Sequence, residues 1–344
     1  MICIVRRKAF DCMAANANLH KAKNAKNDEF YTQLTDVSKE LMHYKHHFKD
    51  KVVFCNCDDP TWSAFWKYFH LNFSALGLKK LISTHYDKTE PTYKMEYTGG
   101  DDNDIEVGIK TPLEGNGDFR NQECLDLLDE SDIVVTNPPF SLFREYVACL
   151  MEHEKKFIIW GNNNAVTYVE IFPLLKENQM WIGYLANSTC VFRVGEGYQF
   201  DKKITESIGD GYKYGKVPAI STFTNLDIQK RHEKLTLWKS YDASEYPKYE
   251  NFDAIEVSKI SEIPVDYDGM MGVPKTFMNI YNPDQFEIIG NAHGDSGVAL
   301  GLIPYPRELR KLNKGMRDGD VYYMKDGMPV IPFSRIIIRK KAGA

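Results

Sequence analysis

Short apolar segments alternate with longer amphipathic ones through the first half of the chain. The apolar segments read KVVFCNC at 51–57, LKKLIST at 78–84, DIEVGI at 104–109, DIVVTN at 132–137 and KKFIIWG at 155–161. Between them, PTWSAFWKYFHLNFSALG (60–77) and SLFREYVACLMEHE (141–154) have the pattern of helices. This alternation predicts βαβ units in an α/β fold with a mostly parallel, doubly wound sheet, whose ligands bind at the carboxyl ends of the strands.

The pattern becomes less regular after about residue 180. Strand-like pieces follow at 180–185, 189–194 and 219–226, and beyond them short strands and turns surround one basic helix, PRELRKLNKG. Residues 85–117, rich in Asp, Gly, Thr and Pro, predict an insertion or a hairpin with irregular loops. The change of pattern near residues 229–239 leads us to expect a flexible N-terminal extension (1–18), a catalytic domain (19–229) and a smaller mixed α+β region (230–344).

The composition is that of a soluble globular protein, with 344 residues, 43% hydrophobic and 26% charged. No apolar run is long enough to cross a bilayer, and the first residues lack the order of a secretory signal. The native start could be Met1 or Met13. The seven cysteines form no CxxC pair, so we expect no structural metal site and no disulfide framework, and a reducing, cytoplasmic location.

The net charge of −5 does not by itself suggest a nucleic-acid partner, but the C-terminal segment is basic. Its candidate contacts to a phosphate backbone are Arg307, Arg310, Lys311, Lys314, Arg335 and Arg339. A local basic patch on an acidic chain can bind a polyanion while the remainder keeps the protein soluble. The alternative is a solvated charged surface without a partner.

The segment DIVVTNPPF at 132–140 is the strongest functional signal. Ile133 to Val135 suit a buried strand, which must stop at Asn137 because prolines cannot donate to a sheet. The result is a stiff loop at the carboxyl edge of the sheet. It presents the Asn137 amide, the Pro138 carbonyl and the Phe140 ring, with Pro139 keeping the loop rigid.

An exocyclic amine is the group that such a loop can hold. Its two hydrogens can be accepted by the Asn137 side-chain oxygen and the Pro138 carbonyl while its ring stacks on Phe140. Fixed acceptors of this kind stabilise the positive charge that develops when the nitrogen attacks, so no strong base is required. The competing interpretation is a rigid turn with no chemical role.

The same residues carry a resemblance to a known family. Asn137–Phe140 matches the Asn/Asp-Pro-Pro-aromatic signature of amino-methyltransferases that use S-adenosylmethionine. Together with KNDEFYTQ at 26–33 and VVFCNCDDP at 52–60, the run DIVVTNPPFSLFREYV makes the chain similar to the EcoRI-type adenine-specific DNA methyltransferases from about Leu19 onward. The resemblance implies a Rossmann-like methyltransferase fold with a C-terminal DNA-recognition region. It also implies transfer of a methyl group to N6 of adenine in duplex DNA, for restriction-modification or anti-restriction protection.

The resemblance implies a cofactor site without a metal, which binds S-adenosylmethionine and releases S-adenosylhomocysteine. Its predicted residues are Phe30, Tyr31, Thr32, Asn56, Cys57, Asp58, Asp59, Pro60, Asp118 and Phe119. The turn after 52–55 lacks the usual glycines, and Asp58 and Asp59 could instead cap the following helix. The residue that binds the ribose stays open among Thr84, His85 and Asp87.

A paired adenine must leave the base stack to reach this loop. A second wall for the flipped base is expected from STFTNLD, with Phe223 and Asn225, or from GNNNAVTY, with Asn162–Asn164; Phe223 is the choice. We expect the base-reading residues beyond Gln229. The resemblance makes GAATTC a first guess for the site and suggests a restriction endonuclease that shares it. The alternatives left open are methylation of another amine, such as cytosine N4 or a protein glutamine, and a catalytically inactive nucleic-acid-binding relative.

Overall fold

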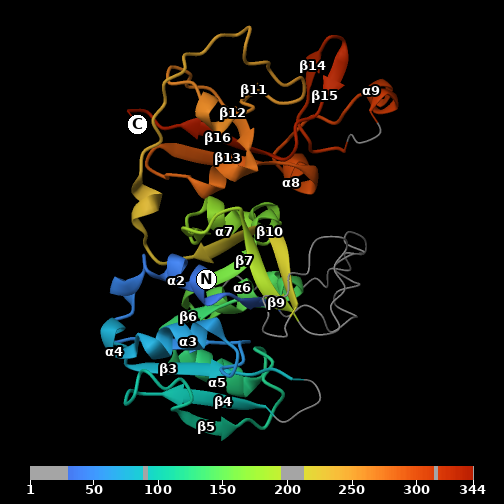
Figure 1. The fold of residues 1–344 in the computed structure, drawn as a ribbon. Helices are drawn as coiled ribbons and strands as arrows, with labels where there is room; N and C mark the ends of the chain where they lie inside the picture. The colour runs from blue at the N-terminus through green and yellow to red at the C-terminus, as the bar shows by residue number, and fades with distance from the viewer. Residues whose placement is uncertain (1–29, 88–91, 195–212, 314–316, 344) are drawn as a thin grey trace, which may run out of the picture.

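The computed structural model describes residues 30–87, 92–194, 213–313 and 317–343, and only the backbone of residues 30, 31, 194 and 213. The expected extension at 1–18 lies outside these residues. The described chain forms two packed bodies, each built on its own sheet (Figure 1). No described helix combines the length and the apolar character needed to span a bilayer.

The larger body is α/β and holds a mixed sheet. Its strands are β1 (Phe30–Thr32), β2 (Val52–Cys55), β3 (Lys80–Thr84), β4 (Tyr93–Tyr97), β5 (Ile109–Pro112), β6 (Ile133–Thr136), β7 (Lys156–Asn162), β8 (Trp181–Ile182), β9 (Ser188–Val194) and β10 (Lys213–Thr224). They lie in the order β1-β9-β10-β7-β6-β2-β3-β4-β5, and β8 pairs with β10. Only the central strands β7, β6, β2 and β3 pair in parallel; the flanking pairs of this sheet are antiparallel. The sheet is therefore less parallel than the sequence pattern suggested.

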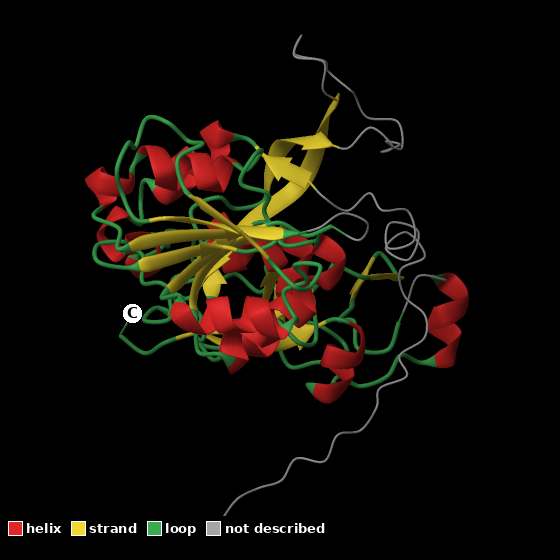
Figure 2. Ribbon diagram, turned by 90° about the horizontal axis from the view of Figure 1, so that it is seen from below, coloured by secondary structure: helices red, strands yellow, loops and turns green. Residues whose placement is uncertain are grey.

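Helices cover both faces of this sheet (Figure 2). They are α2 (Leu34–Leu41), α3 (Ala64–Leu71), α4 (Phe73–Leu76), α5 (Gln122–Glu130), α6 (Phe143–Glu152) and α7 (Phe172–Lys176). Along β2, Val53 and Cys55 join the core cluster that contains the apolar side chains of α2 and α3, whereas Val52 and Phe54 join the cluster of α5 and α6. Both sides of the strand are buried, which explains its uninterrupted apolar run.

The strand order reverses between β2 and β6. From β2 the chain passes through α3 to β3 on one side, and it later returns to β6 on the other side of β2. Successive connections leave the carboxyl ends of β2 and β6 in opposite directions, and a crevice forms at such a switch point. This position is where a doubly wound sheet binds ligands.

Two local predictions are refined by the structure. Residues 85–117 contain the expected hairpin, formed by β4 and β5, but most of 104–109 is loop and its strand begins only at Ile109. The helix predicted within 60–77 starts at Ala64, because the Ser63 hydroxyl accepts a hydrogen bond from the Trp66 amide at 2.8 Å and caps the first turn.

The smaller body is mixed α+β. Its elements are β11 (Ile255–Glu256), β12 (Met271–Pro274), β13 (Phe286–Ala292), α8 (Gly294–Ala299), α9 (Arg307–Leu312), β14 (Tyr323–Lys325), β15 (Met328–Val330) and β16 (Arg335–Lys340). The order β11-β12-β16-β13 makes one sheet, and β14 and β15 form a separate hairpin. The described 3₁₀ turns of the chain are η1 (Lys45–His47), η2 (Phe140–Leu142), η3 (Asn163–Thr167), η4 (Gln229–His232), η5 (Ile260–Glu262) and η6 (Lys275–Asn279).

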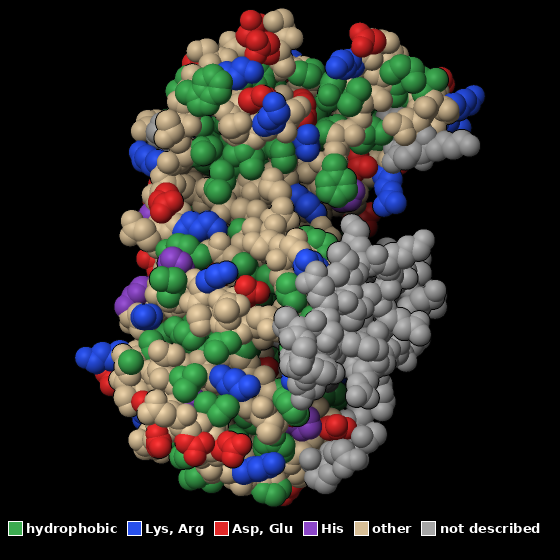
Figure 3. Space-filling view, viewed as in Figure 1, with side chains coloured by type: hydrophobic (Ala, Val, Ile, Leu, Met, Phe, Trp, Pro, Cys, Tyr) green, Lys and Arg blue, Asp and Glu red, His purple; other side chains and the backbone are tan. Residues whose placement is uncertain are grey.

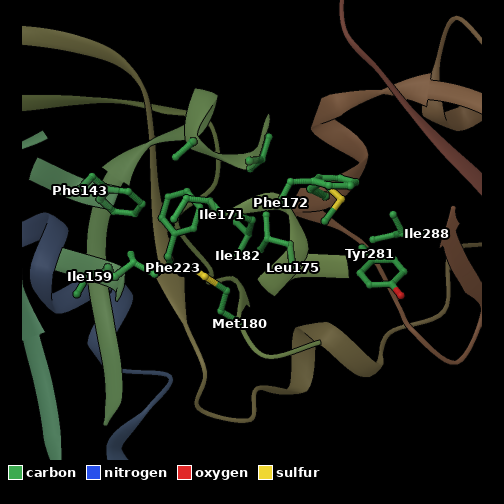
Figure 4. Packing of buried hydrophobic residues seen from close by; sticks show 14 of the residues in the cluster. Phe143, Ile159, Ile171, Phe172, Leu175, Met180, Ile182, Phe223, Tyr281 and Ile288 are labelled. Atoms are coloured by element: carbon green, nitrogen blue, oxygen red, sulfur yellow. The ribbon is translucent and has the colours of Figure 1, made fainter. Parts of the chain in front are cut away.

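One apolar cluster crosses from the larger body into the smaller one (Figure 4). Phe172 and Leu175 of α7 lie on one side of it, and Tyr281 and Ile288 of the smaller body on the other. The Lys176 ammonium also donates to the Ile289 carbonyl at 2.8 Å. The two bodies therefore share buried surface, which holds the smaller one in a fixed position over α7.

Arg335, at the start of β16, is buried in the smaller body. Only 9% of its surface is exposed. Its guanidinium donates to both oxygens of Glu256, at 2.6 Å from Nη2 and 3.0 Å from Nε, and Tyr249 donates to the same carboxylate. Arg335 is thus unavailable for the phosphate contact predicted for it, because its charge is neutralised inside the fold.

We expect the Arg335–Glu256 pair to be essential for the smaller sheet. Glu256→Ala should lower the free energy of unfolding by about 3–5 kcal/mol, because it leaves a buried guanidinium without its partner. Arg339 on the same strand offers a matched control, since it pairs with Glu287 at 2.7 Å on the exposed surface. Glu287→Ala should cost less than about 1 kcal/mol in urea unfolding. Equal losses of unfolding free energy in the two variants would contradict the structural role assigned to the Arg335–Glu256 pair.

Candidate functional site

Polar residues gather at the carboxyl ends of the central strands. Asn56 follows β2, and its side-chain oxygen accepts from the Thr84 hydroxyl at the end of β3 at 3.0 Å. Its backbone carbonyl accepts from the hydroxyl of Thr136, the last residue of β6. Asn56 thus links the ends of three neighbouring strands at the switch point.

The turn after β2 forms without glycine because Asn56 supports it. Cys57 adopts a left-handed backbone with φ of 59°. Its amide donates to the Asn56 side-chain oxygen at 2.8 Å, which compensates for a conformation that side chains rarely adopt. The absence of glycines, which departs from the common motif, therefore has a local explanation.

The two acids of this turn bind the protein's own donors. Asp58 accepts from the hydroxyl of Ser63, the cap of α3, and burial raises the pKa of the Asp58 carboxyl to about 7. Asp59 accepts from the Thr61 amide at 2.9 Å and from the Tyr93 hydroxyl at 2.8 Å. Neither acid caps α3 directly, because Ser63 is the cap; Asp58 holds the Ser63 hydroxyl, and Asp59 stabilises the turn before it.

The loop after β6 has the form expected from its prolines. The strand ends at Thr136, and Pro139 is extended with φ of −53° and ψ of 125°. Phe140 then opens the turn η2, and α6 follows it directly. Pro138 is buried, while Asn137 and Phe140 are partly buried. The prediction that the strand stops before the prolines is confirmed.

Strand β9 brings two further predicted segments to this loop. The Phe192 ring lies edge-on to Phe140, with 6.3 Å between centroids, and Phe192 pairs with Thr32 in the ladder to β1. Next along β9, the Arg193 guanidinium lies 4.3 Å from the centre of the Trp62 ring, which follows the acidic turn. Thr32 and Phe140 therefore both lie beside Phe192, and Trp62, two residues after the predicted segment 56–60, contacts the neighbouring Arg193.

The loop 115–120 lies against the end of β3. Gly117 has φ of 73°, and a β-carbon there would come within 1.9 Å of the His85 carbonyl oxygen, so only glycine fits. Hydrogen bonds from Arg120 hold the pKa of Asp118 below its usual range and occupy both of its oxygens. Phe119 is only 3% exposed and packs edge-on against Tyr146 at 5.0 Å. The loop is at the expected edge, but the Phe119 ring belongs largely to the core.

Two buried polar atoms at this edge have no hydrogen-bond partner within the described part of the chain. They are the Thr32 hydroxyl oxygen and the His85 Nδ1. Buried polar groups are almost always hydrogen-bonded in proteins, so atoms of this kind are suited to a polar ligand. Their positions, beside the proline loop and at the end of β3, fit a ligand that extends along the carboxyl edge.

Phe223 and Asn225 lie away from this edge. Phe223 is fully buried near the end of β10, with its ring 5.0 Å from that of Phe143. Asn225 accepts from the Phe157 amide at 3.0 Å, near the beginning of β7. Phe223 presents no exposed face to a base in this structure, and we leave it out of the site.

The predicted basic residues are divided between several environments. Arg307, Arg310 and Lys311 are exposed on α9, and Arg310 pairs with Asp318. Lys314 lies outside the described residues. On the face seen in Figure 3, positive and negative side chains are interspersed instead of forming a field of one sign. Helix α9 is thus the remaining candidate for a phosphate contact, together with Arg339.

Sequence reasoning missed Glu40, which anchors the element next to β1. Its carboxylate is buried in α2 and accepts from the Tyr184 amide at 3.0 Å and from the hydroxyls of Tyr44 and Thr222, each at 2.8 Å. A glutamate in an amphipathic helix resembles a surface residue, so the pattern gave no sign of this role. Within the described residues no group of three or more His, Cys, Asp or Glu side chains could hold a metal ion.

The comparisons with known proteins agree on one family over most of the chain. The family model described as "Adenine-specific methyltransferase EcoRI" matches residues 18–341. The chain is 45% identical to the type II methyltransferase M.EcoRI of Escherichia coli, over 87% of this chain and 97% of the relative. It is also 45% identical to the type II methyltransferase M.MpnI of Mycoplasma pneumoniae, over 78% of this chain and 84% of the relative. No solved structure matches the chain.

The buried Asp58 predicts a specific pH dependence of stability. Its pKa of about 7 in the folded state lies above the ordinary value of 3.8, so between these values the folded protein holds this proton more tightly than the unfolded chain. Its contribution to stability is complete at low pH and decreases as the pH rises through about 7. Asp58→Asn cannot titrate. Its stability relative to the wild type should therefore rise by about 2–3 kcal/mol between pH 5 and pH 8.

Urea unfolding across this pH range measures the difference. Asp253→Asn provides the control, because the Asp253 side chain is 90% exposed and the substitution removes the same charge. The Asp253→Asn profile should run parallel to that of the wild type. A parallel profile for Asp58→Asn would show that Asp58 is ionised throughout the range.

Proposed function

Since this chain belongs to the EcoRI family of adenine-specific DNA methyltransferases, we propose that it transfers a methyl group from S-adenosylmethionine to N6 of a flipped adenine, held at Asn137–Phe140. Type II DNA methyltransferase activity, in the context of restriction-modification, follows from the family. The observation that supports the residue assignment is the position of the proline loop. It lies at the switch point, next to the polar end of β2 and the Thr32 segment.

The cofactor would lie along the carboxyl edge in a Rossmann-like arrangement. We assign its binding to the segments 30–32 and 56–60 and to Asp118 and Phe119. The buried Thr32 hydroxyl and His85 Nδ1 provide polar contacts there, and His85 is preferred over Thr84 for the ribose because the Thr84 hydroxyl already donates to Asn56. S-adenosylmethionine, when bound, supplies an electrophilic methyl group on a sulfonium.

The residues of the loop would hold the target amine. The Asn137 side-chain oxygen and the Pro138 carbonyl accept its two hydrogens, and the Phe140 ring stacks on the adenine. Accepting these hydrogens orients the nitrogen lone pair toward the donor and stabilises the positive charge that develops during attack. Pro139 keeps the acceptors fixed, so the loop loses little entropy when the base enters.

The duplex must be held while the base leaves the stack. We propose residues 19–229 as the catalytic part and 230–344 as the part that contacts DNA, with the α9 side chains and Arg339 on the phosphates. Flipping costs a few kcal/mol, which contacts to the backbone must offset. An endonuclease that cuts the same site would be the functional partner, acting on the same DNA without a stable complex.

Removing the Asn137 acceptor should abolish transfer. Asn137→Ala should lower the single-turnover rate at least about 100-fold, because a fixed group for the developing charge is lost. Binding of S-adenosylmethionine and DNA should stay close to that of the wild type. Asn103→Ala, the same change at an exposed position in the β4–β5 connection, should leave the rate unaltered. Near-normal turnover of Asn137→Ala would disprove the assigned mechanism.

The chemical product distinguishes the proposed reaction from its relatives. With a tritiated methyl donor and unmethylated duplex DNA, we expect label in N6-methyladenine after digestion to nucleosides. Label in N4-methylcytosine would instead establish the alternative amine, and no label in any duplex would mean an inactive binding protein. Methylation-sensitive sequencing of DNA from cells that express the protein identifies the recognition site.

A further inference from the structure

Phe333 is an exposed aromatic side chain on a rigid support. It is 72% exposed, more than any other large apolar side chain in the described part of the chain. The residues that follow it are buried: Ser334 is 4% exposed and Arg335 is 9% exposed. The Arg335 guanidinium, held by Glu256, also donates to the Phe333 carbonyl at 2.6 Å. The ring is therefore displayed to solvent from a backbone that the buried ion pair fixes.

Lys275 places this ring next to the carboxyl edge of the large sheet. The Lys275 ammonium lies 5.1 Å from the centre of the Phe333 ring and donates to the side chain of Asn164. Asn164 belongs to η3, which directly follows β7, and β7 is the neighbour of β6 in the sheet. Phe333 is thus part of the smaller body but lies close to the edge of the sheet at which β6 ends, just before Asn137.

The surroundings favour a nucleic-acid ligand over a protein partner. A cation beside an exposed aromatic ring is the combination that contacts phosphates and bases together. Nearby on the larger body, the Arg144 guanidinium at the start of α6 lies 4.3 Å from the centre of the Tyr168 ring, directly after η3. In Figure 1, β3 and β9 end on the right, and the hairpin β14–β15 with α8 and α9 lies above them on the same side.

We propose that Phe333 inserts into the base stack of the bound duplex and occupies the space that the target adenine leaves, while Lys275 contacts the adjacent phosphate. This inference rests on the proposed function, because it requires a flipped base at Asn137. An adenine that leaves the stack exposes the faces of its neighbours to water, and an apolar ring can cover them. The insertion would lower the free energy of the flipped state and thereby raise the transfer rate.

The test compares two duplexes, one fully paired and one with a mismatch opposite the target adenine. Both carry the recognition sequence of the wild-type protein in its unmethylated form. Phe333→Ala should slow single-turnover transfer to the paired duplex about 10- to 100-fold, because flipping there must break a base pair and its stacking. With a mismatch opposite the target adenine, the defect should shrink to within about 3-fold of the wild type, since the base already pairs weakly. Phe333→Trp should retain the wild-type rate. In a duplex with 2-aminopurine at the target position, fluorescence should be lower in the complex with Phe333→Ala than in the complex with the wild type.

Trp238→Ala is the matched control, because Trp238 is 70% exposed and lies in the segment that connects the two bodies. It should leave both rates unaltered. A wild-type rate for Phe333→Ala on the paired duplex would overturn the inference, and so would an equal loss on both duplexes, which would indicate a contact unrelated to flipping. Failure of the proposed function would be seen separately, as the absence of methyl transfer by the wild type.

Discussion

Pro138 and Pro139 impose the constraint on which the candidate site depends. Neither residue has a backbone N–H, so β6 cannot continue its ladder and the chain must leave the sheet at Asn137. The same strand end is tied to β2 by the hydrogen bond from Thr136 to the Asn56 carbonyl. A rigid loop and a polar turn are thereby held next to each other at the point where the strand order reverses.

The antiparallel flank of the sheet completes this edge. Strands β10 and β9 extend the sheet beyond β7, and β9 pairs with β1, so Thr32 reaches the side of the proline loop. Glu40 then fixes α2, the helix after β1, through donors on the 184–185 turn and on β10. A cofactor that binds along the carboxyl edge would meet segments that the sheet has already positioned.

The relation between the two bodies is equally well defined. The apolar cluster around α7 and the link from Lys275 to Asn164 join the smaller body to the larger one close to the candidate site. Under the proposed function, a shared core would keep the groups that hold the duplex at a constant distance from the loop that receives the base, whereas a flexible tether would not.

The sequence by itself determined the elements whose pattern is local. Apolar runs predicted the buried central strands, and the two prolines predicted the end of β6. Only the tertiary structure decided the burial and the pairing of residues whose partners are distant in sequence. Arg335 looked like part of a basic tail but pairs with Glu256, which lies 79 positions away, and Phe223 looked like a possible wall but is core. The physical reason is that burial and charge neutralisation depend on which segments pack together. Neither the type of a residue nor its spacing in the sequence predicts that packing.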